Sequence, residues 1–203
     1  MDKVILKAFL STLLAIVILL VCMVAALCLI FPSTMMQLTY KLGLNDCSVY
    51  FAKSAYERSG DVTYIAFATE LSIYENDGGE IYYCGTQFIG DDEFETYCQS
   101  RNQNRPQEST LSYEQYVYGK VYANGYTLAT TIEEKNRIID KSFDCLPQGT
   151  FPRNNAAVAT ILAVLAEDNA EALSRVREKM AMLAPTVSLT DMSYYLEIAA
   201  LIV

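Results

Sequence analysis

The residues that could do chemistry in this sequence are cysteines and carboxylates, because the chain contains no histidine. Without histidine, the commonest general base, the usual partner of a nucleophilic serine and the usual zinc ligand are all missing. The sequence also lacks a glycine-rich phosphate loop and a G-x-G-x-x-G dinucleotide pattern. We therefore expect no catalytic activity and no bound cofactor.

Acidic side chains offer the one enzymatic interpretation that needs no histidine. Glycoside hydrolysis requires only two carboxylates that flank the scissile bond. The candidates are Glu70, Glu75, Asp91, Asp92, Glu93 and Glu95. The last four lie at an expected helix start, where carboxylates cap backbone amides and favour the helix dipole. An envelope enzyme, or a polysaccharide-processing accessory that uses paired carboxylates, is therefore the alternative function.

Four cysteines, Cys47, Cys84, Cys98 and Cys145, follow the apolar N-terminal segment. Cys84 and Cys98 are each seven residues from Asp91, the centre of an expected hairpin turn. Antiparallel packing would bring these two thiols to one level, so we expect a disulfide between them and, by exclusion, a second between the other two. The alternative is that all four are buried reduced thiols. No Cys-x-x-Cys pair occurs, so no metal site is expected.

Tyrosine is unusually frequent, with 15 residues in a chain that has no tryptophan. Five tyrosines lie close together: Tyr113, Tyr116, Tyr118, Tyr122 and Tyr126. Exposed tyrosines favour protein binding, because the ring buries area while the hydroxyl finds a partner. These five are therefore a candidate partner surface. The competing interpretation is that tyrosine fills the core of a protein that lacks tryptophan.

The N-terminal segment has the length and composition of a membrane span. Residues 8–31 are 24 consecutive uncharged residues, and a helix of that length is about 36 Å long, against about 30 Å for the hydrocarbon core. We expect residues 1–31 to be a transmembrane signal anchor that contacts lipid through residues 4–31. The alternative is a signal peptide cleaved near Ala26, although signal peptides usually have only about 7 to 15 apolar residues.

Flanking charges predict how this span is oriented in the cell membrane. Lys3 and Lys7 precede the span, whereas only Lys41 follows it closely. Positive flanks stay cytoplasmic, so we expect a cytoplasmic N-terminus and an extracytoplasmic C-terminal domain. Residues 32–203 contain 13 basic and 23 acidic residues. This acidity disfavours nucleic acid as a partner.

Residues 32–203 are expected to form one acidic all-α domain. Apolar residues at helical spacing, separated by glycine, proline and capping residues, predict successive helical hairpins. The segment 156–166 is apolar nearly all round but only 11 residues long, which indicates a buried core helix rather than a second span. We expect one transmembrane helix followed by a short solenoid of stacked hairpins. The expected helices cover residues 33–43, 46–59, 62–75, 80–88, 93–103, 112–124, 132–146, 156–166, 168–184 and 188–202.

Ala55 and Tyr56, followed by Ser59, Gly60 and Asp61, resemble the turn between the two helices of a tetratricopeptide repeat. The resemblance covers about one repeat, and later hairpins carry no equivalent motif. It implies a stacked-hairpin fold used for protein binding. Together with the anchor, it predicts a membrane-tethered adaptor or scaffold with a protein partner in the envelope. A structural subunit of a membrane complex, docked through its span and its apolar C-terminus, is a further alternative.

Overall fold

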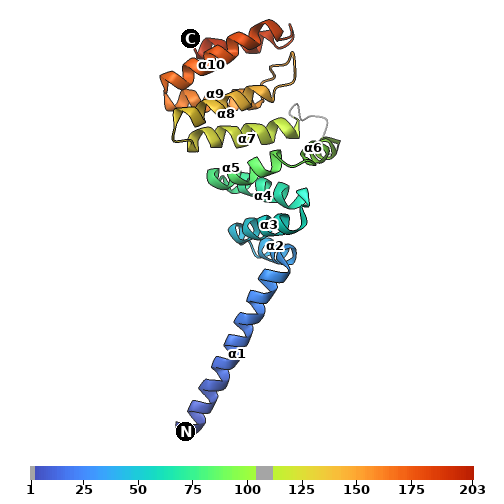
Figure 1. Ribbon diagram of the computed structural model, residues 1–203, viewed down its shortest axis with the longest axis vertical. Helices are drawn as coiled ribbons and strands as arrows, with labels where there is room; N and C mark the ends of the chain where they lie inside the picture. Colours follow the sequence, from blue (N-terminus) through green and yellow to red (C-terminus); the bar gives the residue numbers. More distant parts are fainter. Residues whose placement is uncertain (1–2, 104–111) are drawn as a thin grey trace. The chain divides into compact units, whose positions relative to one another are not determined.

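The computed structural model describes residues 3–103 and 112–203, and within these ranges the protein is entirely helical (Figure 1). The expectation of an all-α fold is confirmed, and the described residues contain no β-strand. The helices are α1 (Lys3–Ile30), α2 (Pro32–Lys41), α3 (Asn45–Ser59), α4 (Val62–Glu75), α5 (Gly78–Ile89), α6 (Phe94–Gln103), α7 (Tyr113–Leu128), α8 (Ile132–Asp144), α9 (Ala156–Glu167), α10 (Ala170–Leu183), η1 (Ala184–Thr186) and α11 (Met192–Leu201).

Helix α1 is long and apolar enough to cross a membrane. Its segment Phe9–Ile30 has 22 residues and a mean hydropathy of 3.4, and no part of it is buried against the rest of the chain. At 1.5 Å per residue this segment is about 33 Å long, close to the hydrocarbon thickness of a bilayer.

The chain divides into two compact units, Met1–Tyr64 and Ile65–Val203, with the boundary inside α4. Helices α2 and α3 thus belong to the same unit as α1. The division into a membrane anchor of residues 1–31 and a domain of residues 32–203 stays a prediction.

In the first unit, α2 and α3 pack together as a hairpin. Buried side chains at helical spacing on α2, Met36 and Thr39, belong to this interface. The hydroxyl of Ser48 donates to Thr39 Oγ1 at 2.9 Å, while Thr39 donates to the carbonyl of Met35, so both buried hydroxyls are satisfied. Helix α3 ends at Gly60, whose φ of 67° is the left-handed conformation that glycine adopts without steric cost.

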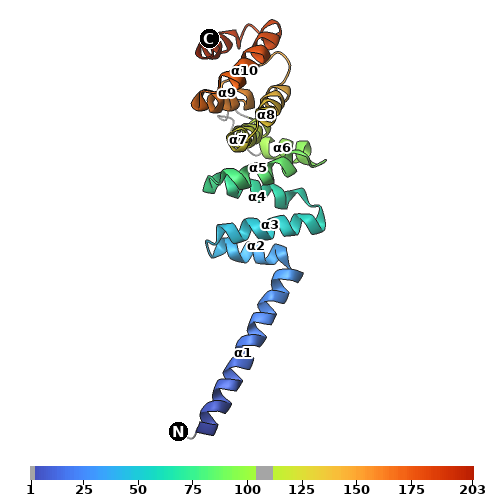
Figure 2. The same ribbon diagram turned by 60° about the vertical axis from the view of Figure 1, so that its left-hand side comes forward.

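In the second unit, helices α7 to α10 form two stacked pairs (Figures 1 and 2). Helix α7 packs on both α8 and α9, α8 packs on both α9 and α10, and α9 packs on α10. Helices α7 and α8 therefore each contact the next helix and the next but one, which is the arrangement of a helical solenoid. Helix α7 also packs on α5 and α6, so it is the central helix of the unit.

Two glycines let α5 and α7 approach closely. A Cβ at Gly85 on α5 would lie 2.1 Å from a methyl of Val121, and a Cβ at Gly125 on α7 would lie 2.4 Å from the ring of Tyr82. A side chain from each helix thus fills the space beside a glycine of the other. The expected end of this helix at residue 124 is wrong: α7 continues to Leu128, because Gly125 is a packing position rather than a helix stop.

Helix ends in the second unit mostly follow their capping residues. The side chains of Thr131 and Glu134 each accept a hydrogen bond from the backbone amide of the other residue, which forms a capping box at the start of α8. Asp168 does not begin α10, as the sequence suggested, but ends α9 in a left-handed conformation with φ of 56°, and Asn169 caps α10 instead. Helix α6 runs to Gln103, as expected, and the connection between the expected helices 93–103 and 112–124 lies outside the described residues.

Candidate functional site: a groove between α7, α9 and α11

The second unit contains an open groove of about 450 Å³ between α7 and α9, with α11 at its side. Its lining is more apolar than polar overall, which is the usual composition of a binding site. The groove is lined by Gln115, Tyr116, Gly119, Lys120, Ala123, Asn124, Arg153, Asn154, Asn155, Val158, Ala159, Leu162 and Tyr194.

Small residues bring α7 and α9 close together at the floor of the groove. A Cβ at Gly119 would lie 3.5 Å from the Cβ of Ala159, so an alanine would just fit there and a larger side chain would not. On the α9 side Leu162 stands out, because 53% of its surface is exposed although the helix is mostly apolar. Leu162 therefore offers apolar surface that no part of the described chain covers.

A buried amide fixes the inner end of the groove. Gln115 donates from Nε2 to the carbonyl of Cys145 at 2.8 Å, and its Oε1 accepts a hydrogen bond from the amide of Ala156. The adjacent Asn155 caps α9 by accepting from the amide of Val158 at 2.9 Å. Because these bonds join α7 to the end of α8 and the start of α9, the walls of the groove are held in register.

Cations line the groove and carboxylates do not. Among its lining residues, Lys120 and Arg153 are basic and none is acidic, although the chain has 24 acidic residues against 15 basic ones. The guanidinium of Arg153 lies 4.9 Å from the ring centroid of Tyr194 and makes an exposed ion pair with Glu197 at 3.4 Å. That pair is weak because both side chains are well solvated, so Arg153 can exchange it for another carboxylate.

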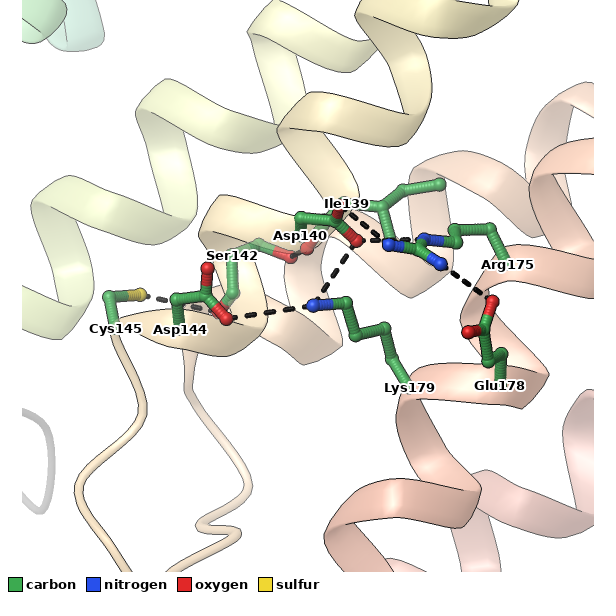
Figure 3. A network of polar contacts seen from close by, with 8 residues as sticks. All are labelled: Ile139, Asp140, Ser142, Asp144, Cys145, Arg175, Glu178 and Lys179. Atoms are coloured by element: carbon green, nitrogen blue, oxygen red, sulfur yellow. Dashed lines mark hydrogen bonds and ion pairs between the residues drawn. The ribbon is translucent and has the colours of Figure 1, made fainter.

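A network of ion pairs joins α8 to α10 (Figure 3). Arg175 makes two hydrogen bonds to the carboxylate of Asp140, at 2.8 and 2.7 Å, and a third to Glu178 at 2.6 Å. Lys179 lies between Asp140 and Asp144, at 3.2 and 3.6 Å. The spacing of Arg175, Arg177 and Lys179 along one helix predicts a solvated basic face, but Arg175 and Lys179 instead join α10 to α8.

The network lowers the pKa of Asp140. Partial burial alone would raise the pKa, but hydrogen bonds and charge from Arg175 and Lys179 outweigh it and lower the pKa below its usual value. A carboxylate with a depressed folded-state pKa stabilises the protein above its unfolded-state pKa of about 3.9, and this stabilisation is lost as the pH falls through the lower folded-state value.

We predict that Asp140→Asn lowers the free energy of unfolding by about 1 to 2 kcal/mol at pH 7, because Asn cannot accept two charged hydrogen bonds. The difference from the wild type should shrink as the pH falls below about 3.9, where Asp140 of the unfolded chain becomes protonated, and vanish once the pH has also passed the lower folded-state pKa. Denaturant unfolding in detergent, followed by circular dichroism, measures both values. Asp144→Asn is the control: its side chain is 72% exposed and its contact is longer, so its effect should be below about 0.5 kcal/mol. Equal effects of the two variants at pH 7 would contradict this prediction.

A second polar cluster joins α7, α8 and the end of α9. The ammonium of Lys135 pairs with Glu167 and lies 4.9 Å from the ring centroid of Tyr126, whose hydroxyl donates to Glu167 at 2.5 Å. The hydrogen bonds from Lys135 and Tyr126 lower the pKa of Glu167. Lys135 is nearly fully buried, so the partnered carboxylate satisfies a charge that would otherwise destabilise the fold.

The carboxylate candidates for catalysis are spread over separate structural roles. Glu70 accepts hydrogen bonds from Arg101 at 2.6 Å and from the hydroxyl of Tyr113 at 2.5 Å, which joins α4 to α6 and α7. Asp91 accepts from the amide of Glu93 at 2.9 Å, as a turn residue does. Among the described residues, no cluster of three potential metal ligands occurs. The candidates Glu75, Asp92 and Glu95 do not line the groove.

The tyrosine cluster is mostly internal. Tyr113, Tyr122 and Tyr126 are buried, and Tyr116 and Tyr118 are partly exposed. Burial raises the pKa of Tyr118 to about 12, with smaller contributions from nearby acidic groups. Of the five residues proposed as a partner surface, Tyr116 lines the groove. Tyr113 packs against Phe88 of α5 and Tyr118 against Phe94 of α6, whereas Tyr126 contacts Lys135 and Glu167.

All six cysteines are present as thiols in the structure. Cys84 and Cys98 are completely buried, Cys145 is partly buried and Cys47 is exposed. Burial, assisted by Glu114 and Glu95, raises the pKa of Cys98 to about 12. Such a thiol reacts slowly, because the thiolate is the nucleophile. The two disulfides stay predictions.

We predict that in the native protein Cys47 reacts with iodoacetamide at least about a hundredfold faster than Cys98 at pH 8. Peptide mass spectrometry of timed samples measures both rates. If the expected disulfide joins Cys84 and Cys98, both will also resist alkylation in denaturant until reductant is added. Complete alkylation in denaturant without reductant would rule out the bridge.

Sequence reasoning missed the groove because its residues carry no motif. Lys120, Arg153 and Leu162 come from different segments, and only folding brings them together. One signal was present in the sequence: α9 has apolar residues on nearly all sides. A helix that packs on the core with one face does not need a leucine such as Leu162 on its outer face. Comparison with known proteins finds no matching family model, no matching curated protein and no matching solved structure.

Proposed function

We propose that this protein is a membrane-tethered interaction module of the cell envelope, which is anchored by α1 and binds a segment of another protein in the groove between α7 and α9. The observation that carries the proposal is the groove itself, with its uncovered Leu162 and its lining of two cations and no carboxylate. No catalytic role is proposed.

The chemistry of the groove describes the partner segment. Its floor accepts apolar side chains, while Lys120 and Arg153 favour carboxylates at the edge. Because the unit is acidic overall, the two cations make the groove more favourable for a carboxylate than most of the surface around it. The partner is therefore an apolar segment with one or more flanking carboxylates.

The architecture supports a binding role. Stacked helical pairs present their helices side by side, which creates extended surfaces for other proteins. The turn from Gly60 to Asp61, where Asp61 accepts a hydrogen bond from the amide of Thr63 at 2.9 Å, suits the tetratricopeptide-like interpretation.

The proposed orientation places the N-terminus in the cytoplasm and the acidic unit outside it. Lys3 and Lys7 support this orientation through the positive-inside rule, because they outnumber the single lysine that closely follows the span. Tethering would confine the groove to partners at the same membrane face. The partner is therefore expected to be an envelope protein.

Photo-crosslinking in intact cells tests the function. A photoreactive amino acid replaces Leu162 in the groove or, as a control, Leu189, which is 94% exposed outside it. Position 162 is expected to give a specific crosslinked band that contains an envelope protein, and position 189 is not. The same bands from both positions would contradict the groove as the binding site. Recovery of only cytoplasmic partners would contradict the orientation.

A further inference from the structure

Helix α2 has an apolar face that the hairpin does not cover. Its buried residues, Pro32, Met36 and Thr39, face α3. A second set at spacing i, i+4, i+7 and i+11 is exposed or only partly buried. We name this set the juxtamembrane stripe: Phe31, Met35, Leu38 and Leu42.

The juxtamembrane stripe is well separated from the packed face. With 3.6 residues per turn, Met35 and Leu38 lie about 100° around the helix from the buried set, and Phe31 and Leu42 cap the two ends of the helix. Leu38 on the helix is 48% exposed, and the two capping residues at its ends, Phe31 and Leu42, are 51% and 64% exposed, so large apolar side chains lie in water along the whole length of α2. An apolar stripe of this kind needs an apolar solvent or a partner.

The position of α2 in the chain points to lipid as that solvent. The candidate span ends at Ile30 and α2 begins at Pro32, so only Phe31 separates them. The side chain of Arg58, near the end of α3, donates to the carbonyl of Leu29 in the last turn of α1. This bond satisfies one of the carbonyls that a helix end leaves without a partner. It also holds the α2–α3 hairpin at the end of the span.

Charge also permits contact with lipid. Residues 32–64 contain three basic and three acidic residues, whereas residues 65–203 contain ten basic and 20 acidic residues. The strong acidity therefore lies outside the first unit, and the hairpin carries no net charge that anionic headgroups would repel. Lys41 and Arg58 are both exposed and can interact with headgroup phosphates.

We propose that α2 lies in the interfacial region of the bilayer, with the juxtamembrane stripe in contact with the upper acyl chains. This inference rests on the proposed anchoring by α1. The stripe would bury its leucines and Phe31 in the interface while the opposite face of α2 stays in water. The α2–α3 hairpin then acts as a collar, which means that it lies on the membrane surface and fixes the depth at which α1 leaves the bilayer.

The absence of tryptophan from the chain allows a sharp test. Single tryptophans replace Leu20 in the span, Leu38 on the stripe, Gln37 beside it and Leu189 in the second unit. Each full-length variant is reconstituted into vesicles of phosphatidylcholine and phosphatidylglycerol in a ratio of about seven to three, which carry brominated acyl chains. Quenching by the bromines reports contact with lipid, and quenching by acrylamide reports contact with water.

The expected result is strong bromine quenching for Leu20→Trp and for Leu38→Trp, the latter strongest with bromines near the headgroups. Gln37→Trp should be quenched at least about twofold less, since it projects about 100° away from Leu38 on the same helix. Leu189→Trp should be quenched only by acrylamide.

If Leu38→Trp behaves like Leu189→Trp while Leu20→Trp is quenched by lipid, the collar is wrong and the anchor stands. If Leu20→Trp is not quenched by lipid, the anchor itself fails. Protection of Leu38→Trp from both quenchers would mean that protein covers the stripe, which also contradicts the proposal.

Discussion

Replacing Leu162 with aspartate is expected to lower the recovery of the partner protein from membranes at least tenfold. Leu162 is half exposed in the groove, so the fold loses little when it is changed, whereas a bound partner would have to bury the new charge. An unpaired charge at an interface centre commonly costs more than the 1.4 kcal/mol that corresponds to a tenfold change in affinity. Quantitative mass spectrometry after crosslinking and affinity purification of the full-length chain measures the recovery.

Leu189→Asp is the matched control, because it makes the same chemical change at a side chain that is 94% exposed and outside the groove. It should leave partner recovery within about twofold of the wild type. The helical circular dichroism of both variants should equal that of the wild type. Undiminished recovery with a folded Leu162→Asp variant would remove the groove from the proposed function.

The substitution Gly85→Ala is expected to lower the free energy of unfolding by about 1 to 2 kcal/mol. Alanine normally favours a helix over glycine by up to about 1 kcal/mol, but here the new methyl would lie 2.1 Å from a methyl of the buried Val121. Such overpacking costs about 1 to 3 kcal/mol or more, because α5 or α7 must shift. Thermal and denaturant unfolding of the detergent-solubilised chain measure the change.

A double-mutant cycle distinguishes this packing contact from a general loss of stability. Val121→Ala alone should also destabilise the protein, since it removes two buried methyls. When both changes are combined, the methyl introduced by Gly85→Ala occupies the space that the side chain of Val121 leaves. The coupling should recover at least about 1 kcal/mol. Additive losses would show that the close approach at Gly85 does not hold α5 on α7.

Helix positions could be predicted well because they depend on local chemistry. The start of α4 at Val62 follows from the turn at Gly60 and Asp61. The start of α8 follows from the capping box at Thr131. The errors arose where tertiary packing decides. Gly125 looked like a stop signal, yet it lies inside α7 because the ring of Tyr82 packs against it.

The groove and the ion-pair networks could not be predicted, because they depend on which distant segments meet. Asp140 and Arg175 are 35 residues apart in sequence, and neither belongs to a motif. Their pairing follows from the stacking of α10 on α8, which the sequence suggests only in general terms. Gln115 is similar: a polar residue on a tyrosine-rich helix gave no sign that it would bond to Cys145 and Ala156.

The apolar C-terminus illustrates a middle case. The stripe of the last helix was evident in the sequence, and the structure buries Ile198 and Ile202 within the second unit. Arg177 further donates to the backbone carbonyls of Ile202 and Val203. Leu196, Leu201 and Val203 nevertheless stay exposed, so docking of a membrane complex through this segment stays a prediction.

Extraction of cell membranes with alkaline carbonate, followed by intact-mass measurement, tests the anchoring by α1 most directly. We predict that the chain stays in the membrane pellet with a mass near the 22.7 kDa of the full sequence. A chain released into the supernatant, or a pelleted product that begins after Ala26, would contradict the proposal that an uncleaved α1 holds the acidic unit at the membrane.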